Sequence, residues 1–150
     1  MRSENLSNIL KKNGFKDIEL DSIIESKHIL KRSGGNFRQY LFSFYDQNYT
    51  EYSLRSDLSI ASVIKFINYK NQKKTKWSYS GEAYRKQNKN DKSPVIKQTG
   101  FEIFGGNSKP KDDYEVIKTS LEIFKKSKYK NCELNLSNIE IFNALIFISS

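Results

Sequence analysis

Two short stretches carry the side chains best suited to hold a small polar ligand. In Val95–Phe104, alternation with a period of two places Gln98, Gly100 and Glu102 on one face of a strand. An amide, a gap and a carboxylate therefore lie in a row, and the glycine leaves clearance for a ligand or a backbone. The opposite face, which we expect to pack on a core, carries Val95, Thr99, Phe101 and Ile103. A hairpin partner can bring Arg85 over the same pocket, although the sequence leaves the register open.

The elements that must position these residues are two strands joined by a lysine-rich loop. Alternation in Trp77–Gln87 and again in Val95–Phe104 predicts a central β-hairpin. A second hairpin is predicted upstream, from Tyr40–Tyr45 and Tyr52–Arg55. Ser56 or Asp57 then opens a helix whose apolar stripe consists of Ile60, Val63, Ile64 and Ile67.

Further elements are predicted on both sides of these hairpins. A first helix ends at Gly14, and a later one begins near Asp112 with acidic residues early and lysines late. Other expected elements are a strand over Phe15–Leu20, a helix over Ser22–Lys31, a strand carrying Cys132, Leu134 and Leu136, and a last helix opened by Ser137 and Glu140. Helices and antiparallel strands together predict an α+β fold.

Length and composition limit the class of protein. A chain of 150 residues with 37% hydrophobic and 13% aromatic residues predicts one domain, residues 1–150, with a real core. No run is apolar enough for a membrane span or a signal peptide, so we expect a cytoplasmic protein. His28 and Cys132 are the only histidine and cysteine, which favours neither a metal site nor a Cys-His nucleophile. No glycine-rich phosphate loop is present, and we expect no bound cofactor.

The net charge of +9 invites a nucleic-acid interpretation, but the composition favours a plainer one. Arginine is scarce among the 26 basic residues, while lysine, asparagine and isoleucine are abundant. This bias is typical of coding sequences rich in A and T. We therefore do not predict a nucleic-acid partner.

Several ordered segments resemble one known family. Trp77–Gly106 resembles motif 2 of class II aminoacyl-tRNA synthetases of the histidyl type, and residues 28–48 and Tyr52–Ile67 extend the match. The likeness is greatest to their non-catalytic paralogue, the regulatory subunit of ATP phosphoribosyltransferase. Synthetases carry Leu-Arg-Pro-Glu-Gly-Thr and the regulatory branch Leu-Arg-Pro-Asp-Leu-Thr. This chain has Leu-Arg-Ser-Asp-Leu-Ser over residues 54–59, with the aspartate of the regulatory branch.

The resemblance implies a ligand site for histidine. Asp57 matches the acid that binds the amino group, Gln98 and Glu102 match strand positions that hold the amino acid, and Arg85 matches the arginine that contacts nucleotide phosphate and substrate carboxylate. Each also has a structural interpretation: Asp57 as a helix N-cap, Gln98 and Glu102 as solvated polar residues, Arg85 in a salt bridge. Gln87 replaces a glutamate that synthetases carry, which argues against synthetase-type ATP binding.

The resemblance implies a fold, a function and a partner. The fold is a partial class II synthetase-like antiparallel sheet flanked by helices, and the chain is expected to be an incomplete core that lacks motif 3. The function is that of a non-catalytic regulatory subunit that binds the short-form catalytic subunit of ATP phosphoribosyltransferase and senses histidine. The alternatives are a histidyl-tRNA synthetase, or a fragment of one, and a non-functional relic. A homodimer is possible, although no proline occurs in the motif 1 region.

Overall fold

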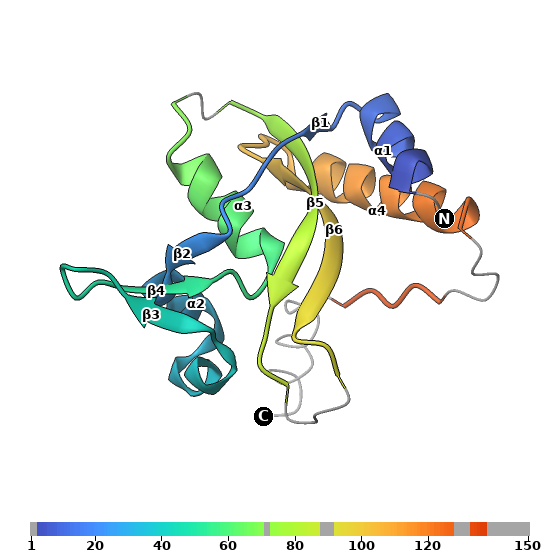
Figure 1. Ribbon diagram of the computed structural model, residues 1–150. Helices are drawn as coiled ribbons and strands as arrows, with labels where there is room; N and C mark the ends of the chain where they lie inside the picture. Colours follow the sequence, from blue (N-terminus) through green and yellow to red (C-terminus); the bar gives the residue numbers. More distant parts are fainter. Residues whose placement is uncertain (1–2, 71–72, 88–91, 128–132, 138–150) are drawn as a thin grey trace, which may run out of the picture.

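The computed structural model describes residues 3–70, 73–87, 92–127 and 133–137 (Figure 1). In chain order the elements are α1 (Ser3–Lys12), β1 (Lys16–Asp17), β2 (Ile23–Glu25), α2 (Ser26–Ser33), the 3₁₀ helix η1 (Gly35–Tyr40), β3 (Ser43–Tyr45), β4 (Glu51–Leu54), α3 (Leu58–Ile67), β5 (Thr75–Tyr84), β6 (Val95–Phe104) and α4 (Lys109–Lys125). None of the described helices has the length and apolar character needed to cross a membrane.

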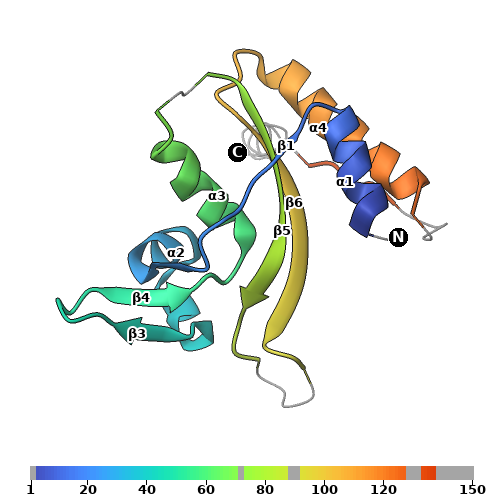
Figure 2. The same ribbon diagram turned by 45° about the horizontal axis from the view of Figure 1, so that its top comes forward.

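The strands form two three-stranded sheets. In the first, β5 lies in the middle, with β6 antiparallel on one edge and the short β1 parallel on the other. In the second, β4 lies between β2 and β3, and both pairings are antiparallel. Helix α3 covers one face of the first sheet, and α1 and α4 cover the other (Figures 1 and 2). The predicted fold class, open antiparallel sheets flanked by helices, is confirmed.

The start of helix α3 is set by its N-cap, and apolar side chains pack the helix against the first sheet. Asp57 begins the helix, and its Oδ1 accepts a hydrogen bond from the backbone N–H of Ile60 at 2.9 Å. One turn of apolar residues then faces the sheet, where Leu58 forms a buried cluster with Tyr79 and Ala83 of β5. The cap and this cluster together fix where α3 starts over the strands.

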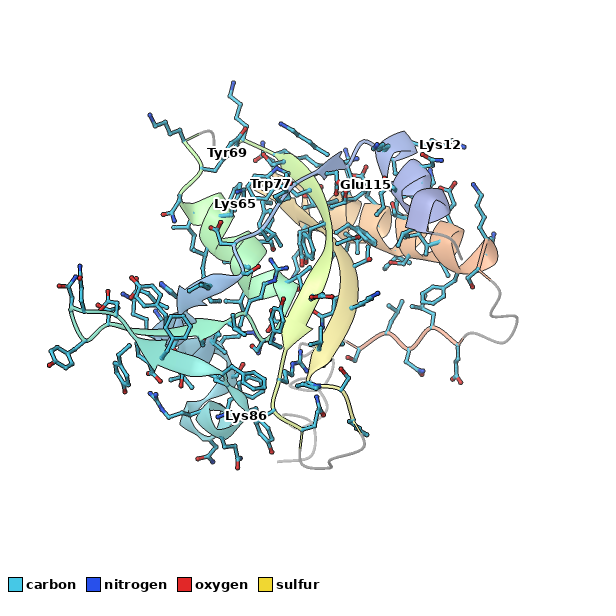
Figure 3. The ribbon with its side chains drawn as sticks, in the orientation of Figure 1. Lys12, Lys65, Tyr69, Trp77, Lys86 and Glu115 are labelled. Atoms are coloured by element: carbon cyan, nitrogen blue, oxygen red, sulfur yellow. The ribbon has the colours of Figure 1, made fainter. Side chains whose placement is uncertain are left out.

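An aromatic cluster anchors the other end of α3. The rings of Phe66 and Phe104 stack with centroids 4.5 Å apart, and Trp77 meets both of them edge-on. Tyr69 adds a fourth ring, 5.4 Å from Trp77, and the two lie together where α3 meets the hairpin (Figure 3). These rings join α3 to both β5 and β6 at this end of the hairpin.

Charged side chains join α1 and α4 to the opposite face. The Nζ atom of Lys76 donates to the backbone carbonyl of Asn13 at 2.9 Å and pairs with Glu115 of α4 (Figure 3). Lys74 reaches Asp112 at 2.6 Å. The hydrogen bond that Lys76 donates to Glu115, reinforced by Lys74, lowers the pKa of the Glu115 carboxyl group. This face of the sheet therefore depends more on ion pairs than the α3 face does.

The second sheet has a core of its own. Ile24 of β2, Ile29 of α2 and Leu41 form a buried cluster, with Ile29 and Leu41 fully enclosed. On the outer side of this sheet, the rings of Phe44 and Tyr52 stack with centroids 6.4 Å apart. The small second sheet is thus packed on α2 on one side and open on the other (Figure 2).

Two of the predicted elements differ in type from those observed, and the strand predicted over Phe15–Leu20 is reduced to Lys16–Asp17. The helix predicted over Ser22–Lys31 begins only at Ser26, because Ile23 and Ile24 pair with β4 as strand β2. The β-branched residues follow the cross-strand pairing available to them rather than the helical pattern. Residues 133–137 are irregular instead of forming the predicted strand. Cys132 and the predicted last helix lie outside the described residues.

Candidate functional site

The structure brings Asp57 and Arg85 to one hollow. Asp57 precedes α3, and Arg85 follows β5, so two distant parts of the chain meet at the start of the helix. The hollow has a volume of about 320 Å³. Its walls are formed by Arg32, Ser33, Phe37, Asp57, Ser59, Ile60 and Arg85. One carboxylate and two guanidinium groups therefore border a space of the size of a small metabolite.

Asp57 uses one carboxylate oxygen to cap α3 and keeps the other for further contacts. Oδ1 accepts the N–H of Ile60, and Oδ2 has no hydrogen-bond partner among the described residues. The structural interpretation of Asp57 as an N-cap is therefore correct. It does not conflict with a ligand role, because a carboxylate has lone pairs for several donors.

Arg85 is fixed in place by the segment before α3. Its Nε donates to the backbone carbonyl of Ser56, the residue before Asp57, at 2.7 Å. Arg85 also lines a second hollow of about 430 Å³ beyond the end of β5. That hollow is bordered by Phe37, Tyr40, Arg85, Lys86, Gln87, Lys92 and Ile96. Lys86 marks its position at the end of the hairpin farthest from Trp77 (Figure 3).

Gln98 and Glu102 are tied to the protein itself and line neither hollow. Gln98 Oε1 accepts from the backbone N–H of Leu58 at 3.3 Å, beside the Asp57 cap. Glu102 Oε1 accepts from the hydroxyl of Tyr79 at 2.8 Å. Both lie on the face of the hairpin that α3 covers. The structure thus places Gln98 next to the hollow and Glu102 farther along the strand.

The gap over Gly100 is filled by Tyr79, which the sequence reasoning did not single out. Tyr79 lies directly opposite Gly100 in the ladder, and a Cβ built on Gly100 would lie 2.6 Å from its ring. Burial raises the pKa of Tyr79 to about 12, and its hydroxyl also contacts Ser59 Oγ at 3.2 Å. The clearance that the glycine provides therefore accommodates an aromatic ring of the protein.

The face predicted to be apolar and buried is the more exposed of the two. On β6, Val95, Lys97 and Thr99 are exposed, while Phe101 is half-buried against Phe15 with ring centroids 5.0 Å apart. The polar face is the one under α3. Of the residues predicted to pack on a core, Val95 and Thr99 are exposed and Phe101 packs on the buried Phe15, while the apolar helix α3 covers the other face.

The family model described as histidyl-tRNA synthetase matches residues 2–149. The chain belongs to the histidyl-tRNA synthetase family. An Acetivibrio thermocellus protein named ATP phosphoribosyltransferase regulatory subunit is 29% identical over 116 residues, which is 73% of this chain and 27% of that protein. The predicted resemblance to this family and its regulatory paralogue is confirmed.

Solved structures of family members share the fold. Apo histidyl-tRNA synthetase of S. aureus has a TM-score of 0.66 and 18% identity, covering 85% of this chain and 30% of that one. A Bacillus halodurans protein described as an ATP phosphoribosyltransferase regulatory subunit/histidyl-tRNA synthetase has a TM-score of 0.62 and 21% identity, covering 81% and 33%. The chain thus spans about a third of the length of these relatives.

Arg55, in the Leu-Arg segment that the chain shares with the family, is a buried cation to which the sequence analysis assigned no role. Arg55 is only 7% exposed, and its Nε donates to the carbonyl of Glu82 at 2.8 Å. Its terminal nitrogen donates to the carbonyls of Leu20 at 2.5 Å and Asp21 at 3.3 Å. Gly81 makes room for it, since a Cβ there would lie 2.6 Å from the guanidinium. Arg55 therefore joins three segments around the start of α3.

The described part of the chain offers no grouping of three or more His, Cys, Asp or Glu side chains that could hold a metal ion. The chemistry available at the hollow is ionic and hydrogen-bonding. A carboxylate and two guanidinium groups that border one hollow suit a ligand that carries both charges. The sequence signal for the role of Tyr79 is its large ring, which lies opposite Gly100 of the neighbouring strand.

Proposed function

We propose that this chain is a non-catalytic regulatory subunit of ATP phosphoribosyltransferase that binds the short-form catalytic subunit and senses histidine. The observation that carries the proposal is the hollow shared by Asp57 and Arg85. A free amino acid presents an ammonium group and a carboxylate, which these side chains can each meet with a charge-assisted hydrogen bond. The relative named as a regulatory subunit supports the assignment of class and partner.

The placement of Tyr79 limits where a ligand can lie. Its ring fills the space above Gly100, and its hydroxyl already engages Glu102. The sensed ligand is therefore assigned to the Asp57 and Arg85 hollow, outside the space that this ring fills. Gln87, a neutral amide at the border of the second hollow, adds no acid for metal-nucleotide binding.

Histidine binding is tested by a pair of matched substitutions. Asp57→Asn keeps an N-cap but removes the charge, so it separates the two roles of this residue. We expect histidine to raise the melting temperature of the wild type and to have no effect on Asp57→Asn. The control is Asp46→Asn, the same change in the remote β3–β4 turn, where Oδ1 accepts from Asn48 and Thr50. A wild type that ignores histidine at millimolar concentration contradicts the ligand assignment.

Partnership is tested separately with the catalytic subunit. We expect the two proteins to purify together and the phosphoribosyl-transfer rate of the catalytic subunit to rise in the complex. Failure of both would remove the regulatory assignment, while histidine binding without association would leave only the ligand site.

The second candidate is a histidyl-tRNA synthetase activity, which the family match and the S. aureus structure favour. Histidine-dependent exchange between ATP and pyrophosphate distinguishes the two. We expect no exchange from the isolated chain, because Gln87 stands where synthetases carry a glutamate. Exchange at a rate typical of synthetases would establish the enzyme instead.

A further inference from the structure

The charges that border the hollow of Asp57 and Arg85 do not balance. Its walls carry one carboxylate, from Asp57, and two guanidinium groups, from Arg32 near the end of α2 and from Arg85 after β5. A free amino acid brings one ammonium group and one carboxylate, which Asp57 and Arg85 can meet. The guanidinium group of Arg32 is then left for the side chain of the ligand.

Both guanidinium groups keep donors for a ligand. The Nε of Arg85 donates to the carbonyl of Ser56, and its terminal nitrogens donate to no residue in the part of the chain that the structure describes. Arg32 is exposed and makes no hydrogen bond or ion pair with any described residue. The two arginines can therefore bind separate groups of one ligand, and neither has to give up a contact within the protein to do so.

Arg32 can form a hydrogen bond only with an acceptor. A guanidinium group has N–H donors and no acceptor atom. A neutral imidazole has one ring nitrogen that accepts a hydrogen bond, whereas both ring nitrogens of an imidazolium are donors. Arg32 can therefore bond to the side chain of neutral histidine, while it repels the side chain of protonated histidine and offers it no hydrogen bond.

The apolar part of the hollow also disfavours a charged ring. Phe37 of η1 and Ile60 of α3 contribute to its walls. A neutral ring can bury its carbon atoms against them, whereas a cation would lose hydration. The opposing effect is the attraction of a cation to the face of the Phe37 ring. Within a hollow of about 320 Å³, repulsion from Arg32 lies at short range and exceeds that weak attraction.

We propose that Arg32 reads the side chain of the bound amino acid and makes the hollow select histidine with a neutral imidazole over histidine with an imidazolium. The proposal rests on the proposed function, since it takes histidine as the ligand. The imidazole loses its charge near pH 6.5, so binding strengthens as the pH rises through that value. If only the neutral form binds, the affinity increases about tenfold between pH 5.5 and pH 7.5.

The other charged groups near the hollow must be separated from this effect. On α2, His28 lies one turn before the lining arginine, and Lys31 is its neighbour in the chain. In η1, Arg38 is paired with Glu51 of β4. After β5, Lys86 borders the second hollow. Histidine is the side-chain type whose charge changes near neutral pH, so His28→Gln is the control for titration of the protein itself.

The test is calorimetric titration with histidine at pH 5.5 and pH 7.5. Arg32→Lys keeps the positive charge, and Arg32→Gln removes it while an amide donor remains. We expect wild type, Arg32→Lys and His28→Gln to bind histidine about tenfold more tightly at the higher pH, and Arg32→Gln to differ by about threefold or less. The second ligand is 1,2,4-triazole-3-alanine, whose ring stays neutral at both pH values. Wild type should bind it equally well at both.

Each outcome decides between the site and its selectivity. Equal affinity for histidine at the two pH values overturns the selection of the neutral form and leaves the histidine site in place. A pH dependence that Arg32→Gln retains, or that the triazole ligand also shows, overturns the role of Arg32, because another group must then titrate. Absence of histidine binding at both pH values overturns the proposed function and this inference with it.

Discussion

The two strands of the central hairpin, β5 and β6, have the same length but differ in burial. β5 buries Trp77, Ser78, Tyr79 and Ala83, while no residue of β6 is buried. Yet β6 is the more aliphatic strand, with Val95, Ile96 and Ile103. Burial here follows from having a neighbour on each edge, which β5 has in β1 and β6, rather than from the apolar content of the strand. Four measurements test this explanation of the burial of β5 and β6.

The largest effect is expected from removing the central ring of β5. Tyr79→Ala should lower the free energy of unfolding by about 4 kcal/mol, because it empties a buried position between Leu58 and Ala83. Phe101→Ala on β6 should cost only about 1–2 kcal/mol, since its ring is half-buried. Urea unfolding of both variants measures the difference. Equal losses would show that β6 is covered in solution.

The next effect compares the glycines of the two strands. Gly81→Ala should cost about 3 kcal/mol, because its Cβ would meet the Arg55 guanidinium, which three backbone carbonyls hold in place. Gly100→Ala meets the Tyr79 ring, but an edge strand can bow outward, so we expect about 1–2 kcal/mol. Thermal unfolding reports both. A larger loss for Gly100→Ala would contradict the view that β6 is free to move.

A smaller effect is expected at the helix that covers both strands. Asp57→Ala removes the cap of α3 and should cost about 1 kcal/mol, whereas Asp57→Asn should change the stability by only a few tenths of a kcal/mol. Chemical denaturation of the two variants separates the cap from the charge. If Asn is as damaging as Ala, the carboxylate contributes to folding through its charge and the cap interpretation fails.

The last measurement uses Tyr79 as a titrating reporter of β5. Its pKa is raised from 10.0 to about 12 in the folded protein, so the folded state holds the proton more tightly. The resulting stability is fully present below pH 10 and is lost as the pH rises toward 12. Wild type should therefore lose stability in this window more steeply than Tyr79→Phe. Parallel pH curves for the two proteins would place the Tyr79 hydroxyl in water.

Local patterns predicted the hairpins and α3 well, because alternation and capping act over a few residues. Trp77–Gln87 and Val95–Phe104 formed the expected hairpin, and Asp57 capped the expected helix. What the sequence did not reveal was which face of β6 would be the more buried. That depends on whether α3 or the pair α1 and α4 packs more closely, and no local pattern records it.

The candidate site was also predicted only in part. Asp57 and Arg85 were expected to approach each other and they line one hollow. Gln98 and Glu102 were expected to face a ligand, and the structure shows them bonded to Leu58 and to Tyr79. Their role in holding a ligand stays a prediction. The partner that fills the Gly100 gap came from the neighbouring strand, and only the register reveals it.

The parallel pairing of β1 with β5 has a consequence for the order of folding. Lys16 lies opposite Trp77, so this pairing closes a loop that contains the whole second sheet and α3. Closing so long a loop costs entropy before any contact repays it, and such non-local pairings slow folding. Because β5 pairs locally with β6 through one turn, we infer that the hairpin forms early. The N-terminal strand joins it last, when Arg55 bonds the carbonyls of Leu20 and Asp21.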